Sequence, residues 1–176
     1  MTKPKLISIS GSIHAGKTTV SRILAKDLWD AAYLDGDMIN SLVKLRNPEL
    51  EILDKRLPKA HGMIAEIIKA SLADGRDVIV DYPLSDKTRS EILNDLEGID
   101  VDAYWFLLQP DINKVLAGSK TRPDLSEWEL SRIKYHYDGD IGWTEMAVVI
   151  DSTNQTPEET ADAIIKYIGG NDENKV

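Results

Sequence analysis

The sequence contains no cysteine, which excludes disulfide bonds, a thiol nucleophile and zinc sites built on cysteine. It also contains no apolar run near the roughly 18 residues that a membrane-spanning helix needs. Residues 1–5 lack the apolar core of a secretory signal peptide. These absences predict a cytoplasmic protein without a membrane partner.

Basic side chains are fewer than acidic ones. The sequence has 21 Lys and Arg against 30 Asp and Glu, which gives a formal net charge of −9. A nucleic-acid backbone requires a basic surface, so we expect no nucleic acid among the partners. A single nucleotide needs only a local positive pocket, which this charge balance allows.

No internal repeat, low-complexity tract or long linker divides the chain. Its 176 residues suit one domain with a substantial core. We expect residues 1–176 to form a single domain, either a monomer or a homodimer. The polar tail from about residue 169 is expected to be frayed.

Residues 11–19, GSIHAGKTT, fit the phosphate-binding loop pattern G-x-x-x-x-G-K-S/T. The apolar run from Leu6 to Ser10 predicts a buried strand before the loop, and four apolar residues follow it at helical spacing. These four residues are Val20, Ile23, Leu24 and Leu28. A strand, a glycine loop and a helix bring backbone N–H groups and the positive helix end to a polyphosphate. The segment therefore predicts a nucleotide site, against the alternative of a chance glycine turn.

Individual loop residues have distinct expected roles. Lys17 is expected to reach the β- and γ-phosphates, and the Thr18 hydroxyl is expected to bind Mg²⁺. His14 occupies a position that the pattern leaves free, where it is expected to contact an acceptor or solvent. The predicted nucleotide-binding residues of the loop are Gly11, Ser12, Ile13, His14, Ala15, Gly16, Lys17, Thr18 and Thr19.

Apolar runs alternate with helical segments along the chain. Strands are predicted at residues 6–10, 31–34, 77–81, 101–108 and 147–150. Further helices are predicted at residues 38–46, 59–73, 85–96, 110–117, 126–137 and 157–168, with Pro48 and Pro58 interrupting the stretch before the second of these. This alternation predicts an α/β fold, in which helices cover both faces of a five-stranded parallel sheet. Ligands of such sheets bind beyond the C-terminal ends of the strands.

Aspartates follow several predicted strands at that end: Asp35, Asp37, Asp81 and Asp151. Asp35 and Asp37 flank a glycine, so one can hold a Mg²⁺-bound water while the other binds an acceptor hydroxyl or takes its proton. The structural alternative is a turn followed by a helix with Asp37 as its N-cap. Asp81 can orient Mg²⁺ through water or act as the base, or it is simply a strand-end aspartate.

Residues 118–125 are small, polar and basic, and they lie between two predicted helices. We expect a mobile lid here, in which Arg122, with Lys120 beside it, closes over the phosphoryl group and neutralises developing charge. Solvated surface charge is the alternative interpretation of both side chains.

Several histidines and tryptophans have no specific role that the sequence can assign. His61 and His136 have no partner at metal-ligand spacing. Trp105, Trp128 and Trp143 are expected either in the packed interior or in a pocket wall, and the sequence leaves this choice open.

Five segments in this order resemble the small P-loop kinases, the group of shikimate kinase, gluconate kinase, adenylylsulfate kinase and chloramphenicol phosphotransferase. These segments are residues 11–19, residues 34–37, Asp81, residues 122–123 and residues 150–159. The resemblance implies a P-loop NTPase fold with strand order 2-3-1-4-5, an acceptor region after the second strand and a basic lid after the fourth.

The same resemblance implies functional roles. Asp35 and Asp37 would serve Mg²⁺ and the acceptor, Arg122 would be the lid arginine, and the loop from Asp151 to Pro157 would border the adenine. The layout is most similar to shikimate kinase. However, Asp81-Tyr82-Pro83 replaces the glycine stretch expected after the third strand, and Gly118 replaces an arginine expected to lie on the adenine.

The expected function is thus an ATP-dependent, Mg²⁺-using transfer of a phosphoryl group to a small-molecule acceptor. The expected catalytic residues are Lys17, Asp35, Asp37, Asp81 and Arg122, with Thr18, Asp35 and Asp81 at the metal. A nucleotide-binding regulator or NTP hydrolase without an acceptor is the alternative, although no Asn-Lys-x-Asp guanine signature is present. A binding module that has lost turnover is a third alternative.

Overall fold

The computed structural model describes residues 3–28, 30–43, 53–120, 126–138 and 142–173. Its centre is a parallel sheet with strand order β2-β3-β1-β4-β5. The strands are β1 (Lys5–Gly11), β2 (Ala32–Asp35), β3 (Val78–Asp81), β4 (Asp102–Leu108) and β5 (Val148–Ile150). The predicted α/β class and the predicted strand order are both confirmed.

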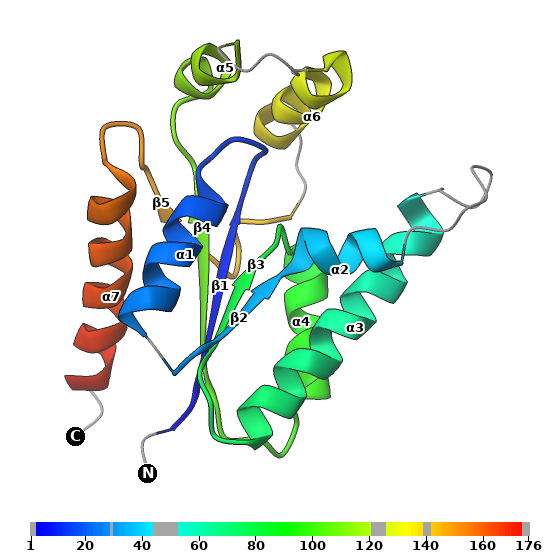
Figure 1. Ribbon diagram of the computed structural model, residues 1–176, viewed down its shortest axis with the longest axis vertical. Helices are drawn as coiled ribbons and strands as arrows, with labels where there is room; N and C mark the ends of the chain where they lie inside the picture. Colours follow the sequence, from blue (N-terminus) through cyan, green and yellow to red (C-terminus); the bar gives the residue numbers. More distant parts are fainter. Residues whose placement is uncertain (1–2, 29, 44–52, 121–125, 139–141, 174–176) are drawn as a thin grey trace.

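Helices cover both faces of the sheet, and two further helices lie beyond its C-terminal end (Figure 1). One face carries α1 (Lys17–Asp27) and α7 (Pro157–Glu173), and the other carries α3 (Leu53–Ala73) and α4 (Asp86–Asp95). The short α2 (Gly36–Leu42) packs against α3. Above the strand ends lie α5 (Ile112–Lys120) and α6 (Glu127–Asp138).

The apolar strands supply two cores because successive side chains point to opposite faces. In β1, Leu6 belongs to the core under α3 and α4, whereas Ile7 and Ile9 belong to the core under α1 and α7. In β4, Trp105 and Phe106 divide between the two cores in the same way. Burial on both faces explains why the strands are continuous apolar runs.

Several helix boundaries differ from the sequence-based expectation. The helix predicted from Lys59 begins at Leu53, so Pro58 lies inside α3. Proline lacks the N–H that would donate to the carbonyl four residues earlier, so α3 contains this residue at the cost of one backbone hydrogen bond. Helix α5 continues through Lys120, so residues 118–120 of the predicted lid are helical. Helix α7 continues to Glu173, so residues 169–173 of the predicted frayed tail are also helical.

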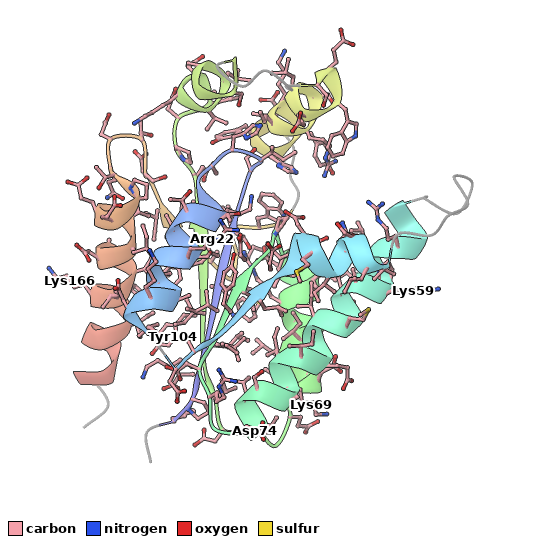
Figure 2. All side chains as sticks on the ribbon, in the orientation of Figure 1. Arg22, Lys59, Lys69, Asp74, Tyr104 and Lys166 are labelled. Atoms are coloured by element: carbon pink, nitrogen blue, oxygen red, sulfur yellow. The ribbon has the colours of Figure 1, made fainter. Side chains whose placement is uncertain are left out.

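The outer helix faces carry charged side chains. Figure 2 shows Lys59 on α3 and Lys166 on α7 projecting away from the sheet. Both residues are exposed, as the polar stripe of an amphipathic surface helix requires. None of the described helices is long and apolar enough to cross a membrane.

Candidate functional site

The predicted phosphate loop connects β1 to α1 and turns tightly around Ser12. The backbone N–H of Ala15 donates to the Ser12 carbonyl at 3.2 Å, and Lys17 Nζ donates to the same oxygen at 2.8 Å. Gly16 is the N-cap of α1 with φ 94°, a left-handed conformation that strains any residue with a Cβ. Helix α1 therefore begins directly at Lys17, and its positive end faces the loop.

Two of the predicted carboxylates, Asp81 and Asp37, act electrostatically on Lys17. Burial lowers the pKa of Lys17, while the negative charges of Asp81 and Asp37 act in the opposite direction. Asp35 is the register partner of Asp81 across the parallel pair β2 and β3. The neighbouring parallel strands β1, β3 and β2 thus place the phosphate loop, Asp81 and Asp35 at the same edge of the sheet.

A tyrosine that the sequence analysis did not single out holds Asp81. The Tyr33 hydroxyl donates to Asp81 Oδ2 at 3.0 Å. Burial raises the pKa of Tyr33 to about 12, and the Asp81 carboxylate contributes to the same shift. Asp81 itself is buried. The phenol therefore stays a hydrogen-bond donor at neutral pH and fixes the orientation of the carboxylate.

Asp35 and Asp37 have different local roles. Asp35 is the N-cap of α2, and its Oδ1 accepts a hydrogen bond from the Met38 N–H at 3.0 Å. The expectation that Asp37 would be this cap is wrong, because the helix begins at Gly36, immediately after β2. Gly36 is required by close packing, since a Cβ there would lie 2.4 Å from the Tyr82 side chain.

Asp37 lies in the first turn of α2, and its side chain is not the N-cap because Asp35 has that role. Partial burial raises the pKa of its carboxyl group, the charge of Lys17 lowers it, and Asp35 and Asp81 raise it further. A carboxylate with a raised pKa is a better proton acceptor than an ordinary surface aspartate. Asp37 is therefore placed and tuned as a candidate base.

Two cavities meet at the phosphate loop. The first, which we call the loop cavity, has a volume of 320 Å³ and is lined by His14, Gly16 and residues of α1, α5 and the start of α7. The second, which we call the aromatic cavity, has a volume of 340 Å³ and includes Ile13 and Asp37. Its rings come from Tyr82, Trp128, Tyr135 and Trp143. Neighbouring loop residues thus line different cavities.

The loop cavity has apolar walls and a polar rim. Val20 and Val115 contribute apolar surface, and Pro157, a predicted nucleotide-binding residue, also lines it. Gly118 also lines it, where the resemblance described above implied an arginine. Asp151 is absent from the described lining. Its Oδ1 instead accepts hydrogen bonds from the backbone N–H and the hydroxyl of Thr153, which shapes the loop before α7 and lowers the pKa of Asp151.

Helix α6 contacts the phosphate loop directly, which the sequence did not indicate. His136 Nδ1 lies 3.3 Å from Ser12 Oγ, and Arg132 lies 3.2 Å from the other ring nitrogen of His136. His14, with φ 64°, lies 3.9 Å from Glu129. Burial, Arg132 and Lys17 all lower the pKa of His136, to about 4, so the ring is neutral at pH 7. His136 thus both lines the aromatic cavity and contacts Ser12 of the phosphate loop.

The predicted metal residues offer oxygen ligands of the kind Mg²⁺ prefers. Within the described ranges, no three His, Asp or Glu side chains form a ready-made metal cluster. Mg²⁺ is usually bound by one or two carboxylates together with water and substrate phosphates. The Thr18 hydroxyl and the carboxylates of Asp35 and Asp81 fit that donor set.

The remaining predicted residues divide between several places. Arg122 lies outside the described residues. Trp105 belongs to the core, whereas Trp128 and Trp143 line the aromatic cavity. His61 and His136, which had no predicted role, line the same cavity. So do Arg56 and Arg132, which the sequence analysis missed because no local pattern shows which helix faces meet at the strand ends.

Comparison with known proteins finds similarity in structure but not in sequence. No protein-family model and no curated protein sequence matches the chain. A gluconokinase from Sinorhizobium meliloti matches with TM-score 0.70 and 16% identity, covering 99% of this chain and 97% of that one. A sugar kinase from a Janibacter species matches with TM-score 0.69 and 17% identity, covering 94% and 95%.

A third similar structure is shikimate kinase from Acinetobacter baumannii in complex with shikimate. It matches with TM-score 0.65 and 20% identity, over 96% of this chain and 94% of that chain. Identities of this size show a shared fold. The chain therefore has the fold of the small P-loop kinases, over nearly its whole length.

Proposed function

We propose that this protein is an ATP-dependent phosphotransferase that moves the γ-phosphoryl group of Mg·ATP to a hydroxyl or phosphate of a small molecule. One observation carries the proposal. Adjacent residues of the phosphate loop line the two cavities, His14 the loop cavity and Ile13 the aromatic cavity, which also includes Asp37. Two separate cavities suit two substrates, a nucleotide and an acceptor. The shared fold with three kinases supports the same conclusion.

The loop cavity suits the nucleotide. The base would lie between the apolar side chains of Val20, Val115 and Pro157, and the phosphates would extend toward Gly16 and Lys17. On binding, the Lys17 ammonium exchanges the Ser12 carbonyl for the phosphate oxygens. Backbone N–H groups at the start of α1 then donate to the same phosphates.

The aromatic cavity suits the acceptor. A hydroxyl or phosphate oxygen of the acceptor attacks the γ-phosphorus of ATP. The bond from that phosphorus to the β–γ bridging oxygen breaks, and ADP leaves. For a hydroxyl acceptor, the proton passes to Asp37, whose raised pKa suits a base. Lys17 neutralises charge on the transferring group.

Thr18, Asp35 and Asp81 would hold Mg²⁺, directly or through water, with Tyr33 orienting Asp81. The ion supplies charge neutralisation on the β- and γ-phosphates. Asp37 lines the aromatic cavity and Asp81 is bonded to Tyr33, so we assign the base to Asp37 and the metal to Asp81.

The test is a screen for acceptor-dependent release of ADP from Mg·ATP. The acceptors are small hydroxylated metabolites, nucleosides, nucleotides, and aminoglycoside or chloramphenicol-type antibiotics. The proposal predicts slow release without an acceptor and fast release with at least one class. ATP hydrolysis at the same rate with every acceptor and with none would instead identify an NTP hydrolase or a nucleotide-dependent regulator.

A further inference from the structure

The aromatic cavity gathers rings that are scarce elsewhere in the sequence. Only 6% of residues are Phe, Trp or Tyr, yet two of the four tryptophans and two of the six tyrosines line this one cavity. They come from three segments distant in sequence, namely the loop after β3, helix α6 and the segment before β5. Tertiary folding therefore builds this wall, and no single amphipathic helix accounts for it.

Two of these rings are only partly covered by other residues of the protein. Trp128 is 59% exposed and Tyr135 is 49% exposed, whereas the core residue Trp105 is 6% exposed. An aromatic ring left open in a cavity can gain contact area only when a ligand covers it. This part of the cavity therefore has apolar ring faces available for a ligand.

The charged side chains around the rings favour an anion. Arg56 and Arg132 line the cavity, and Asp37 is the only carboxylate among its described lining residues. The Arg132 guanidinium lies 4.7 Å from the Tyr135 ring centroid, so charge and ring face occupy the same wall. Arg56 Nε has no hydrogen-bond partner among the described residues, which leaves this guanidinium with donor capacity.

We propose that the acceptor is a small molecule with a flat aromatic ring that carries an anionic group, a carboxylate or a phosphate. Trp128, Tyr135 and Trp143 select the ring, and Arg56 and Arg132 hold the anion. This inference rests on the proposed function, because it assigns the aromatic cavity to the acceptor. The reacting hydroxyl or phosphate then faces Asp37 at the junction with the phosphate loop.

The test compares matched probes that differ only in ring saturation. One pair is phenyl phosphate and cyclohexyl phosphate, and the other is para-hydroxybenzoate and its ring-hydrogenated counterpart. Titration calorimetry without nucleotide should show the aromatic member binding about 3- to 10-fold more tightly in at least one pair, as expected for ring–ring contacts. The pair that shows this preference identifies the anion as phosphate or carboxylate.

Variants link the preference to the cavity. Trp128→Leu should remove the preference while leaving a folded protein, since its ring is mostly exposed. Tyr167 is an exposed aromatic residue on α7 that does not line the cavity, so Tyr167→Leu is the matched control. This variant should still bind the aromatic member of the pair more tightly. Arg56→Gln should weaken the binding of both members of a pair by the same factor. Equal affinity for the two members of each pair, or no binding by any probe, overturns the proposal.

The binding test separates this inference from the proposed function. A ring preference that depends on Trp128, found in a protein that never releases ADP with any acceptor, overturns the phosphotransferase and supports the aromatic-anion site. Acceptor-dependent release of ADP with no ring preference supports the phosphotransferase and overturns the aromatic acceptor.

Discussion

At the scale of single residues, His136 shows how the environment changes the chemistry of one group. Burial comes first among the causes that lower its pKa to about 4, followed by the charges of Arg132 and Lys17. The imidazole is consequently a neutral hydrogen-bonding group between α6 and Ser12, and it is unsuited to act as a cation on a phosphate.

His136 should make the protein less stable in acid. The unfolded chain takes up this proton near pH 6.5 and the folded chain only near pH 4, so the unfolded state binds more protons between these values. The free energy of unfolding therefore falls as pH falls through this window. In His136→Gln, the decrease in thermal midpoint from pH 6.5 to pH 4 should be smaller than in the parent. Parallel midpoint curves would contradict the neutral, buried ring.

Asp37 is expected to act on the acceptor and not on the metal. Asp37→Asn keeps the side-chain volume but removes the proton-accepting charge, and a lost general base typically costs about 10² to 10⁴ in rate. In Asp37→Asn, acceptor-dependent turnover should fall by this factor. The affinity of the variant for Mg·ATP should stay nearly normal. Stability should change by only about 1 kcal/mol or less, since the residue is exposed in the first turn of α2.

Asp35→Asn is the matched control for this prediction. Asparagine keeps the N-cap acceptor for Met38, so folding is preserved. Mg·ATP affinity should weaken in this variant. If the Asp37 variant loses Mg·ATP affinity and the Asp35 variant keeps it, the two roles are exchanged. If neither quantity changes in either variant, the segment is only a turn and a cap.

At the scale of elements, the start of α2 depends on a glycine. A Cβ at Gly36 would lie 2.4 Å from Tyr82, so Gly36→Ala should overpack this contact and destabilise the protein by about 1–3 kcal/mol. Gly62→Ala is the control, because nothing lies within 4 Å of its added Cβ in the middle of α3. That substitution should stabilise the helix by about 0.5–1 kcal/mol. Urea unfolding of both variants measures the difference, and equal effects would contradict the tight packing.

Elements that depend on local patterns were predictable from the sequence. Continuous apolar runs indicated the strands, and the Ser85 side chain caps α4 by accepting a hydrogen bond from the Thr88 N–H. Pro58 was misinterpreted as a break, because α3 continues through it despite the backbone hydrogen bond that proline cannot donate. Gly118 was assigned to a lid, although it is helical and lines the loop cavity.

The approach of α6 to the phosphate loop could not be predicted. Its Arg132 and His136 look like ordinary helix-surface residues, and their position depends on how α6 packs above the strand ends. Tyr33 was likewise only part of a predicted strand, although its hydroxyl holds Asp81 across the sheet. Contacts of this kind join segments far apart in sequence, so local periodicity carries no information about them.

At the scale of the whole molecule, sheet topology brings the two cavities together. Strand β1 lies at the centre of the sheet, so the loop after it has β3 and β2 on one side and β4 and β5 on the other. The carboxylates and the aromatic cavity lie toward β2 and β3, and the loop cavity lies toward β4, β5 and the start of α7. The phosphate loop itself borders both cavities, since His14 lines one and the adjacent Ile13 lines the other.

The measurement that tests this account most directly is acceptor-dependent ADP release from Mg·ATP by the parent, Lys17→Ala and Lys26→Ala. Lys26 is an exposed lysine near the end of the same helix and provides the matched control. A Lys17 variant that folds but loses most acceptor-dependent turnover, beside a Lys26 variant that keeps it, is the predicted result. The rise in thermal midpoint with Mg·ATP should shrink in the Lys17 variant alone, since a ligand stabilises only the state it binds. Unchanged turnover in Lys17→Ala would contradict the assignment of the phosphate loop and, with it, the proposed phosphotransferase.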